Sequence, residues 1–146
     1  MIQKYIGHRP DVALLILRVV IGATFFLYGW NKLTGDGGVA GVTGFLGSIG
    51  IPAAGIMAPI LIAVEILGGL ALILGLGTRL AAILLALVMI IAIVTVKYQA
   101  GFFNGYEFDL ALLTVNIALI LQGGGKYSVD MLWQKKNSAN SDAVMM

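Results

Sequence analysis

The chain has 146 residues, of which 60% are hydrophobic and 11% are charged, and its net charge is +2. About a quarter of the residues of a soluble domain are charged and just under half are apolar, so this composition favours a membrane protein. The absence of cysteine excludes disulfides, iron–sulfur clusters and zinc–thiolate sites as intrinsic features. The single histidine, His8, excludes bis-histidine haem ligation, and the small net charge gives no indication of a nucleic-acid partner.

Four apolar segments predict four membrane-spanning helices, at residues 12–33, 53–76, 78–98 and 106–122. A helix needs about 17–25 residues to span the hydrocarbon core, and the fourth segment is at the short end of that range. In a membrane every backbone polar group must be bonded internally, and the chain lacks the alternating pattern of a β-barrel. The first segment contains Arg18 and has no signal-peptide cleavage site after GWNKL, so we expect it to be retained. The predicted fold is an all-α, integral membrane four-helix bundle.

The segments outside the helices indicate the orientation of this bundle. Residues 12–130 form the predicted membrane domain, whereas residues 1–11 and 131–146 are polar tails, the second of which is expected to be disordered. Most basic residues outside the hydrocarbon core fall on one side, with two on the other: Lys4, Arg9, Arg79, Lys126, Lys135 and Lys136 against Lys32 and Lys97. The positive-inside rule therefore predicts that both termini are cytoplasmic.

The link between the first two predicted helices, residues 34–52, has a glycine at every third position from Gly38 to Gly50. Apolar residues recur in it at helical spacing, at Val42, Phe45, Leu46 and Ile49. This pattern predicts a short interfacial helix on the outer surface. A flexible glycine-rich loop is the alternative.

Glu65 is the only charged residue in the second predicted helix. Counting about 1.5 Å per residue from either end places it near the bilayer midplane, with Asn116 of the fourth helix at a similar depth. A lipid-facing glutamate there would be unfavourable, so we expect Glu65 to face the interior with Arg18 and Asn116 as its partners. Gly68 and Gly69 beside it predict a close approach of another helix. Polar contacts that lock the helices, or a ligand or proton site, are both compatible with this cluster.

A second polar group lies at the predicted outer face. Tyr28 and Lys32 end the first helix and Glu107 begins the fourth, and together they are ligand-binding candidates. Asp109 beside them is accounted for by the preference of acidic groups for helix N-termini. On the cytoplasmic side, Arg79 and Asp130 are candidates for a structural polar pair. No catalytic residue and no metal site is predicted.

Several motifs, taken in order, resemble one known family. They are LRVVIGATFFLYGWNKL in the first helix, GIP at residues 50–52, E-x-x-G-G at 65–69, GLGTRLAA at 75–82, NGYEFDLALL at 104–113 and GGGKYSVD at 123–130. With this order and spacing, the chain resembles the DoxX family of membrane proteins from the first helix to about Asp130.

The resemblance implies a four-helix bundle in the plasma (inner) membrane of a bacterium or archaeon. Members of the family are linked to oxidoreductase systems, some as membrane subunits of thiosulfate:quinone oxidoreductase and others in quinone or oxidative-stress detoxification. The candidate residues in matching motifs are Arg18, Lys32, Glu65, Arg79, Glu107 and Asp130. The family often has His-Gly where Tyr28 and Gly29 stand, so haem or proton chemistry at the outer face is less well supported here.

Three functions are compatible with the sequence. The first is a subunit of, or accessory to, a quinone-linked oxidoreductase or detoxification system, in which Glu65 or Glu107 exchanges protons and Arg18 or Lys32 holds a carbonyl oxygen. Quinone is then the candidate cofactor, and the electrons come from a soluble or membrane oxidoreductase partner. The second is a small-molecule or proton carrier, which with four helices requires a homo-oligomer. The third is a non-catalytic anchor or assembly protein in the bilayer. The resemblance favours the first.

Overall fold

The computed structural model describes Gly7 and residues 9–146 of the chain. Lys4 and His8 lie outside the described residues. Within them, four helical stretches are long and apolar enough to cross a membrane, at residues 10–34, 54–74, 78–100 and 102–122. The prediction of an all-α bundle with four membrane-spanning helices is confirmed.

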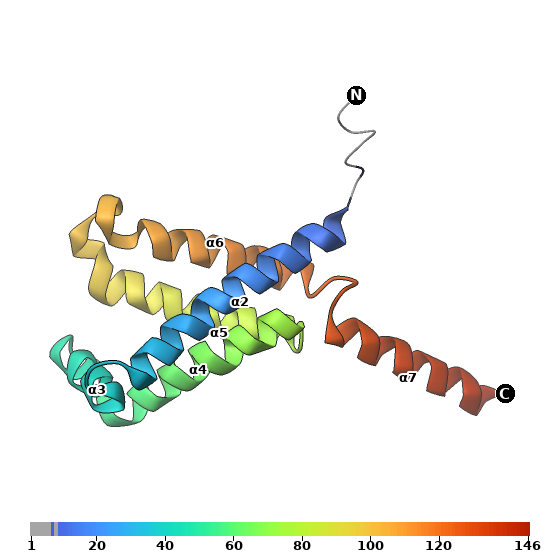
Figure 1. The fold of residues 1–146 in the computed structure, drawn as a ribbon, viewed down its shortest axis with the longest axis horizontal. Helices are drawn as coiled ribbons and strands as arrows, with labels where there is room; N and C mark the ends of the chain where they lie inside the picture. Colours follow the sequence, from blue (N-terminus) through green and yellow to red (C-terminus); the bar gives the residue numbers. More distant parts are fainter. Residues whose placement is uncertain (1–6, 8) are drawn as a thin grey trace.

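The four spans are antiparallel and pack as two pairs (Figure 1). The first pair is α2 (Pro10–Thr34) with α4 (Ala54–Leu74), and the second is α5 (Thr78–Ala92) with α6 (Glu107–Gln122). The two pairs diverge toward the end of the bundle that carries α3 and the α5–α6 turn, which we call the α3 end (Figure 1). They converge at the opposite end, called the α7 end, where the last helix begins.

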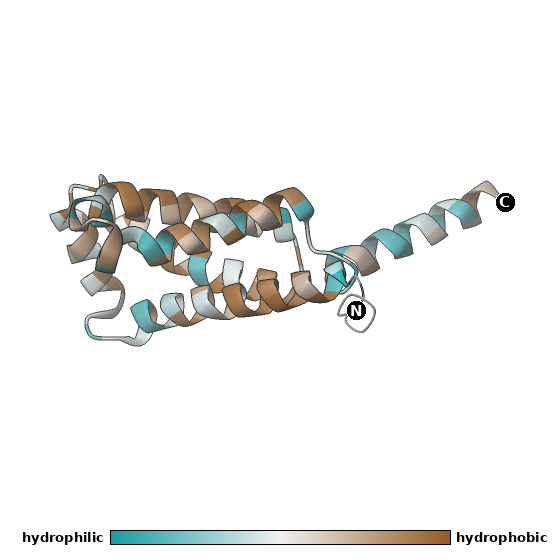
Figure 2. Ribbon diagram, turned by 90° about the horizontal axis from the view of Figure 1, so that it is seen from above, coloured by the Kyte–Doolittle hydropathy of each residue, from teal (hydrophilic) through white to brown (hydrophobic). Residues whose placement is uncertain are grey.

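The spans are hydrophobic along most of their length (Figure 2), and most of their large apolar side chains are exposed. At most 33% of the apolar stretch of any span is buried inside the protein, so the remaining surface suits contact with lipid chains. The interior is a single small core in which all four spans take part, formed by Leu14, Ile21, Phe25, Leu72, Ala81, Ala82, Leu85, Met89, Leu112 and Leu119.

Glycines bring α2 and α4 into backbone contact. A Cβ atom added at Gly22 would lie 2.5 Å from the carbonyl oxygen of Gly69, and one at Gly69 would lie 2.5 Å from that of Gly22. One at Gly29 would lie 2.9 Å from the Cβ of Glu65. Small residues permit such an approach, as predicted for Gly69, and the contact places Glu65 directly opposite α2.

Short helical segments make the connections at the α3 end. The helix predicted in the first link is present as α3 (Gly38–Ser48), which packs against α4 and α2. Beyond α5 the chain continues through a π-helical turn, η1 (Ile93–Lys97), and a 3₁₀ turn, η2 (Tyr98–Ala100). It then reverses through η3 (Phe102–Tyr106), where Asn104 adopts a left-handed conformation with φ of +57°.

The C-terminal segment is helical, so the expectation of a disordered tail is wrong. It forms α7 (Val129–Met145), which extends away from the bundle (Figure 1). The Ser128 hydroxyl caps this helix by accepting a hydrogen bond of 3.3 Å from the backbone N–H of Met131. Residues 129–145 contain neither glycine nor proline, so the polar composition that suggested disorder is compatible with an exposed helix.

Candidate functional site

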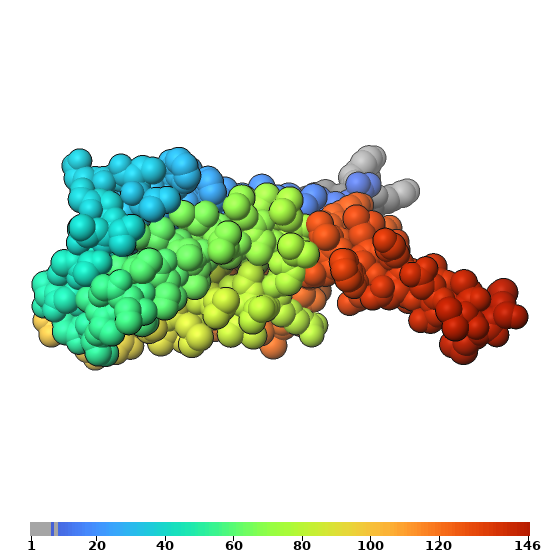
Figure 3. Space-filling view, turned by 90° about the horizontal axis from the view of Figure 1, so that it is seen from below, coloured from blue at the N-terminus to red at the C-terminus, as the bar shows by residue number. Residues whose placement is uncertain are grey.

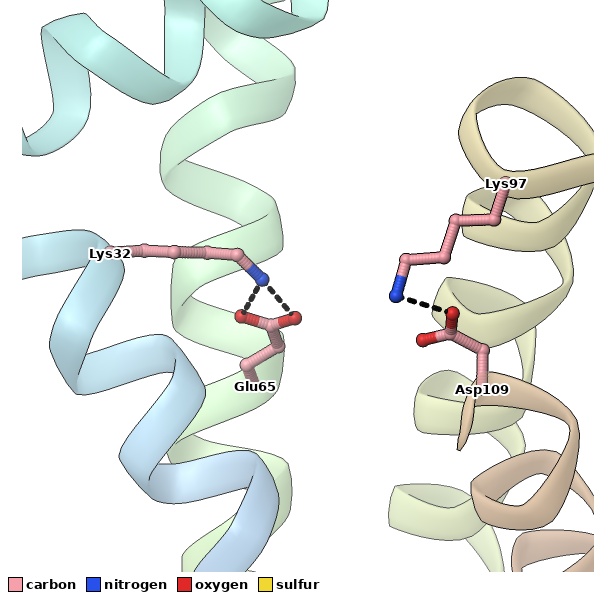
Figure 4. A network of polar contacts seen from close by, with 4 residues as sticks. All are labelled: Lys32, Glu65, Lys97 and Asp109. Atoms are coloured by element: carbon pink, nitrogen blue, oxygen red, sulfur yellow. Dashed lines mark hydrogen bonds and ion pairs between the residues drawn. The ribbon is translucent and has the colours of Figure 1, made fainter. Parts of the chain in front are cut away.

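Lys32 and Glu65 form an ion pair inside the bundle. Lys32 lies in the last turn of α2, and Glu65 lies in the middle of α4. The Lys32 ammonium donates to both carboxylate oxygens of Glu65, at 2.5 and 2.6 Å (Figure 4). The Glu65 side chain is 2% exposed and that of Lys32 is 31% exposed. The carboxylate is therefore buried, while the Lys32 side chain stays partly accessible and its ammonium group retains a third N–H donor.

A second ion pair occupies the other helix pair. The Lys97 ammonium, at the end of η1, lies 2.6 Å from Oδ2 of Asp109 in the first turn of α6. Its contact lacks the angles of a hydrogen bond, so the buried Oδ2 atom has a charged neighbour but no hydrogen-bond donor. As in the first pair, the carboxylate is buried, at 7% exposure, and the lysine is more accessible, at 38%.

The two pairs face each other across the interior of the bundle (Figure 4). Both ammonium groups point inward from opposite helix pairs, each backed by its own carboxylate. Each pair is neutral overall, which reduces the cost of placing charges in an apolar region. The arrangement can present cationic N–H donors to one ligand from two sides. We call Lys32, Glu65, Lys97 and Asp109 the double ion-pair site.

The other outer-face candidates have different roles. Tyr28 is half exposed and packs against Phe108 of α6, with ring centroids 6.1 Å apart, so it bridges the two helix pairs beside the double ion-pair site. Glu107 accepts a hydrogen bond of 3.0 Å from the backbone N–H of Asn104. Glu107 therefore stabilises the turn before α6, in the manner of a capping box, and does not join the two lysines.

Asn116 is fully buried on α6, but it makes no hydrogen bond to Glu65, so the predicted partnership of these two residues is wrong. Its side-chain nitrogen donates 2.9 Å to the backbone oxygen of Leu112, whereas its Oδ1 atom has no hydrogen-bond donor among the described residues. Asn116 lies seven residues beyond Asp109, which is about 10 Å along the helix toward the α7 end. It thus lies apart from the Lys97–Asp109 pair, and it makes no hydrogen bond to Glu65.

Arg18 is also separate from Glu65, because its guanidinium is fixed at the α7 end. It donates to the backbone oxygens of Leu72 at 3.1 Å, Ile73 at 3.4 Å and Tyr127 at 3.0 Å, and to that of Gly124. The last carbonyls of a helix lack partners within the helix and carry its negative dipole end, so the C-terminus of α4 attracts this cation. The predicted partnership with Glu65 is replaced by a cage of neutral carbonyls.

The predicted pair of Arg79 and Asp130 is likewise replaced by a backbone contact. Asp130 accepts hydrogen bonds from the backbone N–H groups of Gly77 at 2.8 Å and Thr78 at 3.1 Å. These are unpaired donors at the start of α5, which a carboxylate satisfies well. Arg79 is exposed, and no ion pair joins it to Asp130 in the described part of the chain.

The sequence predicted Lys32 and Glu65 as members of two different polar clusters. Asp109 was explained by the preference of acidic residues for helix N-termini. The missing information was the offset between helices along the bundle axis. Gly29 lies opposite Glu65, so the four-carbon stem of Lys32 has only one helical turn to cover. Lys97 and Asp109 flank the same turn, and this sequence proximity was the available signal for their pairing.

Residues 13–98 match the family model described as DoxX. No solved protein structure matches the chain. Among the described residues, no group of three or more His, Cys, Asp or Glu side chains could hold a metal ion.

Curated relatives match over almost the whole length of the chain. A Bacillus subtilis protein named "Putative oxidoreductase CatD" is 38% identical over 134 residues, which cover 91% of this chain and 96% of that protein. The "Inner membrane protein YqjF" of Escherichia coli is 30% identical, covering 86% of this chain and 95% of that one. A Mycobacterium tuberculosis protein, "Uncharacterized membrane protein Rv3486", is 33% identical, with 87% and 85% covered. The four apolar spans, the family model and these relatives agree, and the chain belongs to the DoxX family.

Proposed function

We propose that this protein is a membrane subunit of, or an accessory to, a quinone-linked oxidoreductase or detoxification system, and that it binds the quinone at the double ion-pair site. The observation that carries the proposal is that Lys32 and Lys97 face one interior region from opposite helix pairs, each against a buried carboxylate (Figure 4). The name of the Bacillus subtilis relative, "Putative oxidoreductase CatD", supports the same class of function.

The donor set fits a ligand with two carbonyl oxygens on opposite sides of an apolar ring. Lys32 keeps one N–H free after bonding Glu65, and Lys97 makes no directed hydrogen bond to Asp109. Tyr28 and Phe108 supply aromatic surface beside these donors. A quinone, when bound, supplies two-electron, two-proton redox chemistry. With a quinone bound, Lys32 and Lys97 would donate hydrogen bonds to its two oxygens. The two protons taken up on reduction would come from these lysines, and Glu65 and Asp109 would return protons to them.

The electrons come from a partner protein in this proposal. With no cysteine and one histidine, the chain has no thiolate ligands for an iron–sulfur cluster and no histidine pair for haem. A separate oxidoreductase, soluble or in the membrane, therefore reduces or oxidises the ligand held by this subunit.

We further propose that both termini are cytoplasmic and that the double ion-pair site lies toward the opposite membrane surface. Arg9, Arg79 and three lysines beyond α6 lie at the α7 end. The two lysines nearer the α3 end, Lys32 and Lys97, are both in ion pairs. The positive-inside rule favours the α7 end as the cytoplasmic side.

A small-molecule or proton carrier is the second candidate. The Asn116 Oδ1 atom favours it. This atom is buried, lies on the α7 side of Asp109 along α6 and has no hydrogen-bond donor among the described residues, so a water or solute in transit would satisfy it. Transport by the protein in vesicles, abolished by Asn116→Leu, would favour the carrier. Quinone binding that survives Asn116→Leu favours the redox subunit.

The test of the proposed function is quinone retention after purification in mild detergent, measured by solvent extraction and mass spectrometry. The informative variant is the double substitution Lys32→Gln and Glu65→Gln, which removes both charges together and leaves no unpaired ion. Arg79→Gln is the control, because this exposed residue lies at the other end of the bundle. We expect quinone with the wild type and the control, and at least tenfold less with the double variant.

Two results would contradict the proposal. The first is wild-type protein that carries no quinone and binds none when a short-chain analogue is added. The second is a folded double variant that retains as much quinone as the wild type. Either result would transfer the double ion-pair site to the class of contacts that lock helices together.

A further inference from the structure

We propose that the α7 end contains a binding site for one anionic glycerophospholipid, with the phosphate between Arg9 and Lys126 and an acyl chain along Leu74, Val129 and Leu132. This site is distinct from the double ion-pair site and does not depend on the proposed function. We call it the lipid site.

Two adjoining hollows form the lipid site. The first, of about 270 Å³, is lined mainly by apolar side chains of the end of α4 and the start of α7, including Leu74, Val129 and Leu132. The second, of about 200 Å³, lies against the start of α2 and is lined by residues 9–12. Lys126 and Tyr127 line both hollows, so a polar compartment and an apolar compartment meet at these two residues.

The position matches the boundary between lipid headgroups and acyl chains. The start of α2, the end of α4 and the start of α7 meet at one end of the apolar spans (Figure 3). Tyr127 and Trp133 are exposed there, and Leu132 is 65% exposed. Exposed aromatic residues of this kind concentrate at the level of the headgroups. The apolar hollow therefore opens where an acyl chain begins and the polar hollow where a phosphate lies.

The charges of the polar hollow suit a phosphate. Arg9 and Lys126 supply two cations, and Asp11 is the one carboxylate among the lining residues. Asp11 is already engaged, because its Oδ1 atom accepts a hydrogen bond of 2.9 Å from the backbone N–H of Lys126. The hollow thus has a net positive charge, and both cationic side chains remain exposed to a ligand.

The loop that carries Lys126 and Tyr127 is held rigidly. Arg18 binds the backbone oxygens of Gly124 and Tyr127, and the Ser128 hydroxyl donates 2.7 Å to the oxygen of Gly125. Asp130 bonds the chain at Gly77 and Thr78. A pre-formed frame lowers the entropy cost of ordering a ligand, which favours a defined site over diffuse attraction to the membrane surface.

The test measures the lipids that remain bound to protein taken from vesicles of phosphatidylglycerol and phosphatidylcholine in equal amounts. The variant is Arg9→Gln with Lys126→Gln. The matched control is Lys135→Gln with Lys136→Gln, which removes the same charge from the exposed part of α7. Native mass spectrometry should show about one phosphatidylglycerol on the wild type and the control. The variant should retain at least tenfold less, since each basic residue near a membrane surface contributes substantially to anionic lipid binding.

Other outcomes would overturn the lipid site. Equal losses in the variant and the control would indicate diffuse attraction by the basic residues of the α7 end. Equal retention of the two lipids would remove the role of charge, and inorganic phosphate that displaces the lipid completely would remove the role of the acyl chain. If the variant does not fold, the wild type alone decides: retention that does not fall when the salt is raised tenfold contradicts a charge-based site. None of these outcomes changes the quinone retention expected at the double ion-pair site. The lipid site and the proposed function can therefore fail independently of each other.

Discussion

The two ends of the bundle bury cations in different ways. At the α7 end, Arg18 is 1% exposed and its guanidinium donates to neutral backbone oxygens. Toward the α3 end, Lys32 and Lys97 meet buried carboxylates and remain about one-third exposed. Arg18 therefore has almost no exposed surface left for a ligand, whereas both lysines keep exposed surface and N–H donors that a ligand could reach.

This difference separates a structural cation from candidate functional ones. Arg18 satisfies carbonyls at the end of α4 and in the loop after α6, so it joins three parts of the chain that are distant in sequence. An ion pair with an accessible ammonium can instead exchange a proton or receive a ligand oxygen without disrupting the backbone. Each of the following substitutions tests one side of this comparison.

The largest effect is expected for Arg18→Met. The substitution removes the Arg18 donors from the oxygens of Gly124 and Tyr127 and leaves the oxygen of Leu72 with only the Gly75 N–H. We expect a loss of about 3–5 kcal/mol in the free energy of unfolding. Arg18→Lys should recover only part of it, since a lysine has three donors and no planar fork. Denaturant titration in mixed micelles measures the change. A loss below about 1 kcal/mol would show that the carbonyl cage is not a main source of stability.

Lys32→Gln should have the next largest effect. It leaves the Glu65 carboxylate buried without its counter-charge, and we expect a loss of about 1–3 kcal/mol, reduced because the lysine is partly exposed. Adding Glu65→Gln should restore part of the stability, and the double-mutant cycle should give a coupling energy of about 1–2 kcal/mol. Additive effects of the two substitutions would mean that the pair does not form in the membrane.

A smaller effect is expected at the predicted polar pair that the structure separates. Asp130→Ala removes the acceptor of two N–H groups at the start of α5, at a cost of about 1 kcal/mol. Arg79→Ala should change the free energy of unfolding by less than about 0.5 kcal/mol, because the residue is exposed. The unfolding titrations of the two variants distinguish them. Equal losses of unfolding free energy in the two variants would instead support the ion pair between Arg79 and Asp130 that the sequence predicts.

The smallest effect is expected on truncation after Trp133. The removed part of α7 is exposed throughout, so the unfolding midpoint of the four spans should stay unchanged. Circular dichroism should report only the loss of the helical residues themselves. A large fall in the midpoint would show that α7 supports the α7 end.

The fold was predictable because apolar length determines which segments span a membrane. The four spans, the short helix after α2 and the close approach at Gly69 followed from hydropathy and glycine spacing. The helical state of residues 129–145 did not, since polar composition alone does not distinguish an exposed helix from a disordered tail. A serine cap and the absence of helix breakers were the signals that could have predicted it.

The polar contacts were less predictable than the helices. Depth counted from the ends of each helix gives no information about how far one helix is shifted past another. Glu65 was therefore expected beside Arg18 and Asn116, and the observed offset places it beside Lys32. Backbone atoms were the other unseen partners. Arg18, Asp130 and Glu107 bond to main-chain groups at turns and helix ends, which side-chain patterns in a sequence do not display.

The most direct test of the difference between the two ends uses the two tryptophans of the chain. Trp30 lies two residues before Lys32, whereas Trp133 lies at the start of α7. The Trp133→Phe variant keeps only Trp30 and reports on the α3 end, whereas the Trp30→Phe variant keeps only Trp133 and reports on the α7 end. A short-chain quinone quenches the fluorescence of a tryptophan that lies near it. We predict saturable quenching of Trp30 that Lys32→Gln with Glu65→Gln abolishes, and only weak, linear quenching of Trp133. Equal, linear quenching of both would contradict a ligand site at the double ion pair.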